Sequence, residues 1–247
     1  MILTKSPGLV LRNLTLGYDQ HPAVHHLDGQ VRPGALLAII GPNGSGKSTL
    51  LKGIAGCLPV LGGSIENSFA RLAYMPQIGE LNRDFPVSVF DLALTGLCSG
   101  AGLFGRISRA DRDKAMTAIA AVGLQGFEDR SIRTLSGGQL QRLIFARLML
   151  QDAELILLDE PFAAVDQRTT ADLLAIIAGW HAEGRTVITV LHDVETVRTH
   201  FADCLLLARE TIAWGPCDIV ITDANLAQAR SMSEAFDREA AFCHRAA

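Results

Sequence analysis

The sequence lacks a run of apolar residues long enough to cross a membrane. Apolar runs such as residues 35–40, 155–158 and 204–208 fall far short of the ~20 residues that a bilayer crossing needs. Short runs that are apolar on both faces are typical of buried parallel strands. The N-terminus also lacks a basic region followed by an apolar stretch and a small-residue cleavage site, the pattern of a secretory signal. We therefore expect a cytoplasmic protein.

Positive charge is scarce as well. Lys and Arg together number 22 against 26 Asp and Glu, which gives a net charge of -4. Because nucleic-acid binding needs concentrated positive charge, this balance argues against a nucleic-acid partner. A composition of 49% hydrophobic and 19% charged residues is typical of a globular chain. A chain of 247 residues can bury one substantial core, or a main domain with a smaller lobe.

Closely spaced cysteines are missing. The five cysteines contain no C-x-x-C pair and are scattered along the chain: Cys57, Cys98, Cys204, Cys217 and Cys243. An odd, dispersed set indicates buried thiols rather than disulfides or a metal cage. His244 follows the last cysteine, but adjacent residues rarely converge on one ion without further ligands. We expect no metal site there.

Alternating strand and helix patterns dominate both ends of the chain. In the first part we expect strands at 9–16 and 34–40, separated by a loop rich in His and Asp, and then a helix from Lys47 to about residue 55. The second part predicts a strand, a helix and a strand, at 154–158, 169–180 and 186–191. This alternation predicts a parallel α/β sheet covered by helices.

The middle of the chain predicts an inserted helical lobe. Helical periodicity occurs at 89–97 and 111–122, around a loop containing Gly100, Gly102 and Gly105. An amphipathic helix follows at 138–150, with Leu140, Ile144 and Leu148 on its apolar face and Gln141 and Arg142 facing elsewhere. We expect one domain, with a core at about 1–85 and 151–225, a lobe at about 86–150 and a helical tail at about 226–247.

A glycine-rich loop follows the first buried strand. It fits the pattern G-x-x-x-x-G-K-[ST], with the residues Gly41, Pro42, Asn43, Gly44, Ser45, Gly46, Lys47, Ser48 and Thr49. Its glycines let the backbone curl so that N–H groups, and the positive end of the next helix, face phosphate oxygens. Lys47 would place a charge on the β- and γ-phosphates, and Ser48 a hydroxyl on Mg²⁺. The loop predicts a site for ATP and Mg²⁺.

Two acidic residues end the strand at 155–158. Asp159 and Glu160 should lie beside Lys47, because ligands bind beyond the carboxyl ends of parallel strands. Asp159 would hold Mg²⁺, as the equivalent aspartate does in P-loop enzymes. Glu160 would polarise the attacking water while Lys47 and Mg²⁺ take up charge developing on the phosphoryl group. The pair therefore predicts ATP hydrolysis.

A second helix start suited to an anion lies in the stretch L-S-G-G-Q, residues 135–139. Together with the two preceding elements, this stretch resembles the signature of the ATP-binding cassette family, over about residues 9–215. The resemblance implies a P-loop NTPase (RecA-like) α/β core with an N-terminal antiparallel β subdomain and an inserted α-helical signature lobe. It also implies that the signature turn clamps the γ-phosphate of ATP bound to a second cassette, in a homodimer. The residues of this turn are Ser136, Gly137, Gly138 and Gln139.

The resemblance gives roles to four further residues. Tyr18 would stack on adenine, and Gln77 would link the γ-phosphate and Mg²⁺ to the helical lobe. Asp166 would contact the partner cassette, and His192 would sense the γ-phosphate. Leu140 stands where glutamine is common, and the loop before Asp166 reads A-A-V rather than S-A-L. Neither departure removes a chemical group that hydrolysis needs.

Three segments, at 82–89, 103–106 and 108–112, are similar to the zinc/manganese/iron uptake branch, whose members carry F-P-x-[ST]-V after the glutamine loop. This similarity implies uptake of a divalent metal, with zinc or manganese favoured, through a membrane permease and an extracytoplasmic metal-binding protein. The chain would be peripheral on the cytoplasmic face of the cell membrane. The permease's cytoplasmic helix would dock between the Gln77 region and the lobe at 86–132. An importer of iron–siderophore, haem or cobalamin is the alternative.

Soluble cassette ATPases of translation, DNA repair or cofactor assembly form a further alternative class. Those of translation usually carry two cassettes in one chain, and those of repair insert long coiled coils. The sequence has neither feature.

Overall fold

The computed structural model describes residues 8–19, 21–81, 83–97, 107–163 and 165–235. Several residues singled out above lie outside these ranges: Asn82, Cys98, the loop glycines Gly100, Gly102 and Gly105, residues 103–106, Ala164, and the tail beyond residue 235 with Cys243 and His244.

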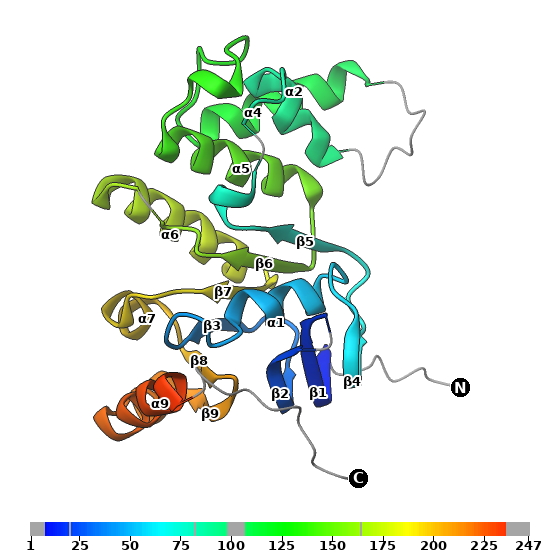
Figure 1. Cartoon of the computed structure of the whole chain (residues 1–247). Coiled ribbons are helices and arrows are strands. Elements are labelled where there is room, and N and C mark those ends of the chain that lie inside the picture. Colours follow the sequence, from blue (N-terminus) through cyan, green and yellow to red (C-terminus); the bar gives the residue numbers. More distant parts are fainter. Residues whose placement is uncertain (1–7, 20, 82, 98–106, 164, 236–247) are drawn as a thin grey trace.

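A three-stranded antiparallel sheet forms one flank of the molecule (Figure 1), in the order β2-β1-β4. Its strands are β1 (Leu9–Tyr18), β2 (His21–Val31) and β4 (Val60–Asn67). The expected antiparallel β subdomain is therefore confirmed. The prediction of a loop between the strands at 9–16 and 34–40 is wrong, because residues 21–31 form a strand that pairs with β1.

Irregular pairing explains why the hydrophobic pattern of the sequence does not predict β2 as a strand. Its buried apolar residues are Val24, Leu27 and Val31, spaced by three and four positions rather than two. The register between β1 and β2 shifts at several places, and His26 has a positive φ of 46°. Such bulges insert extra residues into a strand and break its alternation.

The second sheet has six strands in the order β5-β6-β7-β3-β8-β9, of which only the edge strand β9 is antiparallel to its neighbour. The strands are β3 (Leu36–Ile40), β5 (Leu72–Met75), β6 (Leu155–Asp159), β7 (Thr186–Val190), β8 (Asp203–Ala208) and β9 (Glu210–Pro216). All side chains of β6 and β7 are buried, as expected of central parallel strands. The predicted parallel α/β sheet is confirmed.

Helices cover this sheet and form the lobe at the top of Figure 1. Those beside the sheet are α1 (Lys47–Ile54), α6 (Gln167–Ala182), α7 (Val194–His200), α8 (Cys217–Val220) and α9 (Asp223–Ala235). The lobe contains α2 (Val89–Leu94), α4 (Arg109–Ala121) and α5 (Gly137–Gln151). Short 3₁₀ turns lie at Ile78–Glu80, Thr95–Leu97 and Ile132–Thr134. Among the residues that the structure describes, no helix combines the length and apolar character of a membrane crossing.

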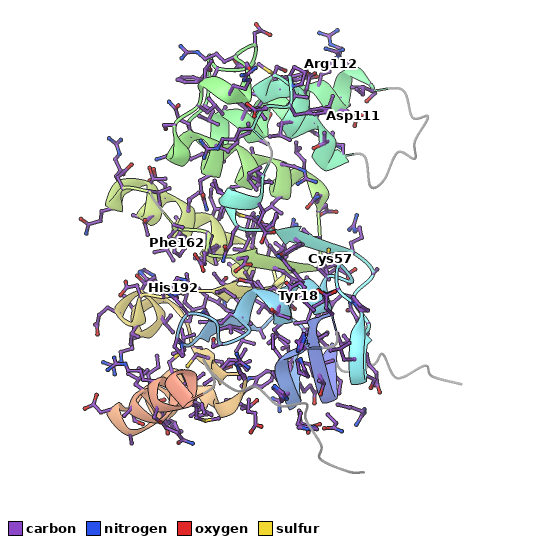
Figure 2. All side chains as sticks on the ribbon, viewed as in Figure 1. Tyr18, Cys57, Asp111, Arg112, Phe162 and His192 are labelled. Carbon is purple, nitrogen blue, oxygen red and sulfur yellow. The ribbon has the colours of Figure 1, made fainter. Side chains whose placement is uncertain are left out.

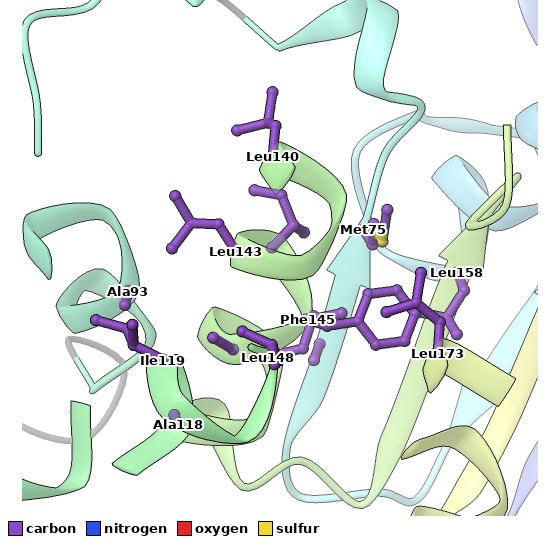
Figure 3. Packing of buried hydrophobic residues seen from close by; sticks show 14 of the residues in the cluster. Met75, Ala93, Ala118, Ile119, Leu140, Leu143, Phe145, Leu148, Leu158 and Leu173 are labelled. Atoms are coloured by element: carbon purple, nitrogen blue, oxygen red, sulfur yellow. The ribbon is translucent and has the colours of Figure 1, made fainter. Parts of the chain in front are cut away.

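Helix α5 joins the lobe to the sheet through one hydrophobic core. Figure 3 shows Phe145 of α5 between Met75 of β5 and Leu173 of α6, while Ile119 of α4 packs on the other side of the helix. The Phe145 ring also stacks on Trp180, with centroids 5.5 Å apart. Because these residues belong to one buried cluster, α5 packs against both the lobe and the sheet.

The prediction of buried thiols is confirmed for two of the three cysteines that the structure describes. Cys204 and Cys217 are buried and free, whereas Cys57 is exposed. Cys57 follows the end of α1, and its backbone N–H bonds to the Lys52 carbonyl. The expectation of a buried thiol is wrong at this position, because Cys57 lies in the turn after α1 rather than on the buried face of the helix.

Candidate functional site

Three adjacent parallel strands end at one edge of the larger sheet. β3 leads into Gly41, β6 ends at Asp159, and β7 ends two residues before His192. A cavity of about 840 Å³ lies at this edge, lined by Ala23, residues 43–49, Gln77, Glu160 and His192. Its volume is typical of small-ligand sites. The structure therefore brings most of the expected phosphate and hydrolysis residues together.

The glycine-rich loop is shaped by close backbone contacts. Gly46 has a φ of 93°, and a Cβ on it would lie 2.6 Å from the Ala23 carbonyl oxygen of β2. A Cβ on Gly41 would lie 2.0 Å from the Leu207 carbonyl oxygen. No side chain could replace either hydrogen without moving a strand. Helix α1 then begins at Lys47 with Gly46 as its N-cap, so its first N–H groups face the loop rather than a capping side chain.

The Lys47 ammonium group is folded back onto the loop. Its Nζ donates to the carbonyl oxygens of Gly41 and Pro42 at 3.0 and 2.8 Å. The side chain is buried, and this burial lowers the pKa of Lys47, although nearby Glu160 and Asp159 oppose the shift. The cation is thus held at the cavity by neutral carbonyl oxygens and forms no direct ion pair with any residue that the structure describes. Such a charge is suited to an anionic ligand.

Asp159 lies behind the cavity lining and is fully buried. Its Oδ1 accepts a hydrogen bond from Ser48 Oγ at 3.0 Å, whereas Oδ2 has no hydrogen-bond partner among the described residues. Burial raises the pKa of Asp159 to about 6. A buried carboxylate with an unpaired oxygen is costly unless a cation or a further donor reaches it.

Glu160 lies at the centre of a network from four elements. Its Oε1 accepts a hydrogen bond from Gln77 Nε2 at 2.9 Å and lies 2.6 Å from His192 Nε2. The same Gln77 amide also lies 3.2 Å from Ser48 Oγ. The backbone of Glu160 has a φ of 51°, a left-handed conformation that is strained for a side chain with a Cβ. This turn aims the carboxylate at the cavity rather than along the strand.

The signature turn lies outside the cavity lining. Ser136 is the N-cap of α5, and its Oγ accepts a hydrogen bond from Gln139 N at 3.3 Å. Gln139 Oε1 in turn accepts one from Ser136 N at 2.9 Å, which completes a capping box. Gly137 and Gly138 form the first turn of the helix. The signature turn is therefore a well-formed helix start, but it does not contribute to the cavity at this chain's own phosphate loop.

Asp166 and Tyr18 also lie outside the cavity lining. Asp166 is the N-cap of α6 and accepts hydrogen bonds from Thr169 N and Thr169 Oγ1, both at 2.9 Å. Tyr18 ends β1 and is 47% exposed. Figure 2 shows it toward the three-stranded sheet, whereas His192 lies beside α7. The sites expected for adenine and for a partner chain are therefore on the open surface.

Gln141 corrects the pattern predicted for α5. It was expected to face away from the apolar side, but its side chain is fully buried and its Nε2 donates to the Pro161 carbonyl. Gln141 forms a stripe with Ile144, Phe145 and Leu148, all buried. This i, i+3, i+4, i+7 spacing marks one face of a helix, and it could have identified Gln141. Ala23 also lines the cavity; it belongs to β2, where the sequence pattern predicts a loop, and so the sequence does not indicate it.

Comparison with known proteins agrees with this geometry. A match to the ABC transporter family covers residues 24–163. The manganese transport system ATP-binding protein MntB of Bacillus subtilis is 40% identical over 223 residues, covering 87% of this chain and 89% of that protein. The zinc transport system ATP-binding protein TroB of Treponema pallidum is 40% identical over 210 residues, covering 82% and 79%.

Solved structures share the fold over most of the chain. One, described as a metal-chelate type ABC transporter in an inward-facing conformation, has a TM-score of 0.82 and 28% identity, and the match covers 92% of this chain and 90% of that chain. A dimeric bacterial ABC transporter cassette has a TM-score of 0.75 and 23% identity, with 85% and 98% covered. The second likeness concerns the fold alone.

Proposed function

This chain belongs to the ABC transporter family of ATPases, and from that premise we propose that it powers uptake of a divalent transition metal, zinc or manganese, through a partner permease. The observation that carries hydrolysis is Glu160, held by Gln77 and His192 at the mouth of the loop that contains Lys47. The printed functions of the relatives in Bacillus subtilis and Treponema pallidum, manganese and zinc transport, support the cargo.

The proposed chemistry uses charges that the fold already holds in position. The phosphates of ATP would accept hydrogen bonds from the backbone N–H groups of residues 43–49. Lys47 would turn its ammonium from the loop carbonyls toward the β- and γ-phosphates. Glu160 would accept a proton from the attacking water, which it can do because its carboxylate faces the cavity. Gln77 and His192 fix that carboxylate through Oε1 and leave Oε2 for the water.

The donors beside Lys47 fit Mg²⁺. Asp159 Oδ2 is buried without a partner among the described residues, and Ser48 Oγ lies 3.0 Å from Oδ1 of the same carboxylate. These are hard oxygen donors of the kind that Mg²⁺ binds. Burial raises the pKa of Asp159, and a cation at this position would oppose that shift by favouring the charged carboxylate. Asp159, Ser48 and Gln77 would hold the ion, which when bound offsets negative charge on the phosphate oxygens.

We propose that the second half of the ATP site comes from another copy of the chain. The helix start formed by Ser136, Gly137, Gly138 and Gln139 is suited to an anion, and it does not line this chain's cavity. In a homodimer this turn would close on the γ-phosphate of the facing chain, and Asp166 would contact that chain. Tyr18, half exposed at the end of β1, would stack on the adenine ring.

The permease partner would meet the lobe rather than the sheet. Phe85 and Ile107 are exposed large apolar side chains, at 62% and 52%; Phe85 immediately precedes the lobe and Ile107 lies within it. We propose that a cytoplasmic helix of the permease docks between the Gln77 region and the lobe at 86–132. The chain would then be peripheral on the cytoplasmic face of the membrane, and a metal-binding protein outside would deliver the ion.

The proposed function is tested by expressing the chain with the permease encoded beside it. The chain should sediment with membranes, and the cells should take up Mn²⁺ or Zn²⁺ only when both proteins are present. Uptake of an iron–siderophore, haem or cobalamin instead would move the chain to the alternative importer class. Recovery of a wholly soluble protein bound to ribosomes or DNA would contradict transport altogether.

A further inference from the structure

Gln141 is a buried polar side chain that the proposed chemistry does not use. It is fully buried in α5, although glutamine is usually exposed. Its Nε2 donates to the Pro161 carbonyl, while its Oε1 has no partner among the described residues. Burying an amide with one unsatisfied oxygen costs stability. An apolar side chain of the same size would avoid that cost but would leave the Pro161 carbonyl without this donor, so the bond to Pro161 is what the buried amide contributes.

The bond from Gln141 reaches the turn that aims Glu160. Pro161 directly follows Glu160, whose left-handed backbone persists only where neighbouring contacts hold it. One such contact is within the turn, from Ala163 N to the Glu160 carbonyl at 3.1 Å. Gln77 and His192 hold the Glu160 side chain, whereas the bond from Gln141 ties the backbone of the turn to helix α5.

The same part of α5 leads back to the signature turn. Gln141 lies two residues after Gln139, whose side chain closes the capping box with Ser136. The next residue, Arg142, donates to Thr169 Oγ1 at 3.1 Å, and Thr169 Oγ1 donates to Asp166 at 2.9 Å. Two consecutive side chains of α5 therefore hold the Glu160 turn and the Asp166 cap.

We propose that Gln141 is a positioning residue for Glu160, which fixes the hydrolytic carboxylate to the helix that starts at the signature turn. This proposal rests on the proposed function. Because Ser136 and Gln141 belong to the same rigid helix start, a shift of the signature turn against a facing chain displaces the Pro161 carbonyl as well. The rate of hydrolysis then depends on Gln141. The conformation of the phosphate loop and its affinity for ATP do not depend on Gln141.

The test compares two identical substitutions on one helix. Gln141→Met keeps the volume and removes the donor, and Gln151→Met is the matched control. Gln151 also lies on α5, with a buried Oε1 that has no partner within the described part of the chain, but it is ten residues further on, about 15 Å along the axis. We expect Gln141→Met to lower kcat for ATP about 10- to 100-fold, as misplacement of a reacting group does. KM for ATP should stay within about twofold, and Gln151→Met should leave both unchanged.

A second variant separates positioning from packing. Gln141→Asn keeps the amide but is one methylene too short to reach Pro161, so it should lose kcat to a similar extent. Thermal unfolding and ATP binding are measured on every variant. Wild-type kcat in Gln141→Met, an equal loss in Gln151→Met, or failure of both Gln141 variants to fold would each overturn the proposal. If the unaltered chain does not hydrolyse ATP, the proposed function fails instead.

Discussion

Glu160→Gln is expected to bind ATP like the unaltered chain and to hydrolyse it about 10²- to 10⁴-fold more slowly, the range for loss of a positioned general base. The substitution keeps the shape of the side chain, and its amide oxygen can still accept the hydrogen bond from Gln77. An amide cannot take a proton from water at neutral pH. The phosphate loop and Lys47 are untouched, so affinity should persist.

Phosphate release in a single turnover and ATP affinity should be measured on the same preparation. Glu154 provides a matched control, because it immediately precedes β6, at the end of the strand opposite to Glu160, and accepts a hydrogen bond from Ala70 N. Glu154→Gln should leave the rate unchanged. Wild-type turnover by Glu160→Gln would show that Glu160 is not the base.

Lys47→Ala should instead weaken ATP binding itself, by about 10- to 150-fold. This range corresponds to the 1.5–3 kcal/mol of a hydrogen bond to a charged group. The loss comes from the phosphates, which lose the cation that would turn toward them, because the bonds to the Gly41 and Pro42 carbonyls are given up when ATP binds. The dissociation constant is measured by titration with a fluorescent ATP analogue.

The control for this charge is Lys114→Ala, which removes an exposed lysine from α4 in the lobe. Its affinity for ATP should equal that of the unaltered chain. An undiminished affinity in Lys47→Ala would contradict the phosphate loop as the nucleotide site.

The phosphate loop could be predicted because its chemistry is local. Residues 41–49 follow one another in sequence, and the strand and helix that flank them carry their own signals of burial and periodicity. The structure adds that Gly46 must clear the Ala23 carbonyl. That contact comes from β2, whose bulges hid it from the pattern.

The convergence on Glu160 could not be predicted from spacing, because it depends on strand order. β6 pairs with β5 on one side and with β7 on the other. Gln77 follows β5 and His192 follows β7, so both side chains arrive beside Glu160 at the end of β6. Only the family resemblance indicated these two residues. The order of the strands, which brings Gln77 and His192 together, cannot be read from the sequence pattern.

Gln141 shows a limit of a different kind. A four-residue period through Leu140, Ile144 and Leu148 is correct for one edge of the buried face, but α5 is buried over a wider arc, between the lobe and the sheet. A polar residue inside that arc contradicts a simple hydrophobic pattern. Such contradictions are expected where function constrains the residue.

The most direct measurement of a composite site mixes two inactive variants. Lys47→Ala removes the cation of the phosphate loop, and Gly138→Asp places a negative charge at the signature turn. Gly138 has room for a side chain, since a Cβ would meet Val165 and Thr169 at 3.7 and 3.9 Å. Each variant alone should be nearly inactive in ATP hydrolysis.

Mixed in equal amounts, the two variants should regain roughly a quarter of the wild-type rate, because half of the dimers pair unlike chains and each such dimer holds one complete site. The loop of the Gly138→Asp chain would face the intact signature turn of the Lys47→Ala chain. A mixture no more active than its components would place all the catalytic groups within one chain and would contradict the shared site.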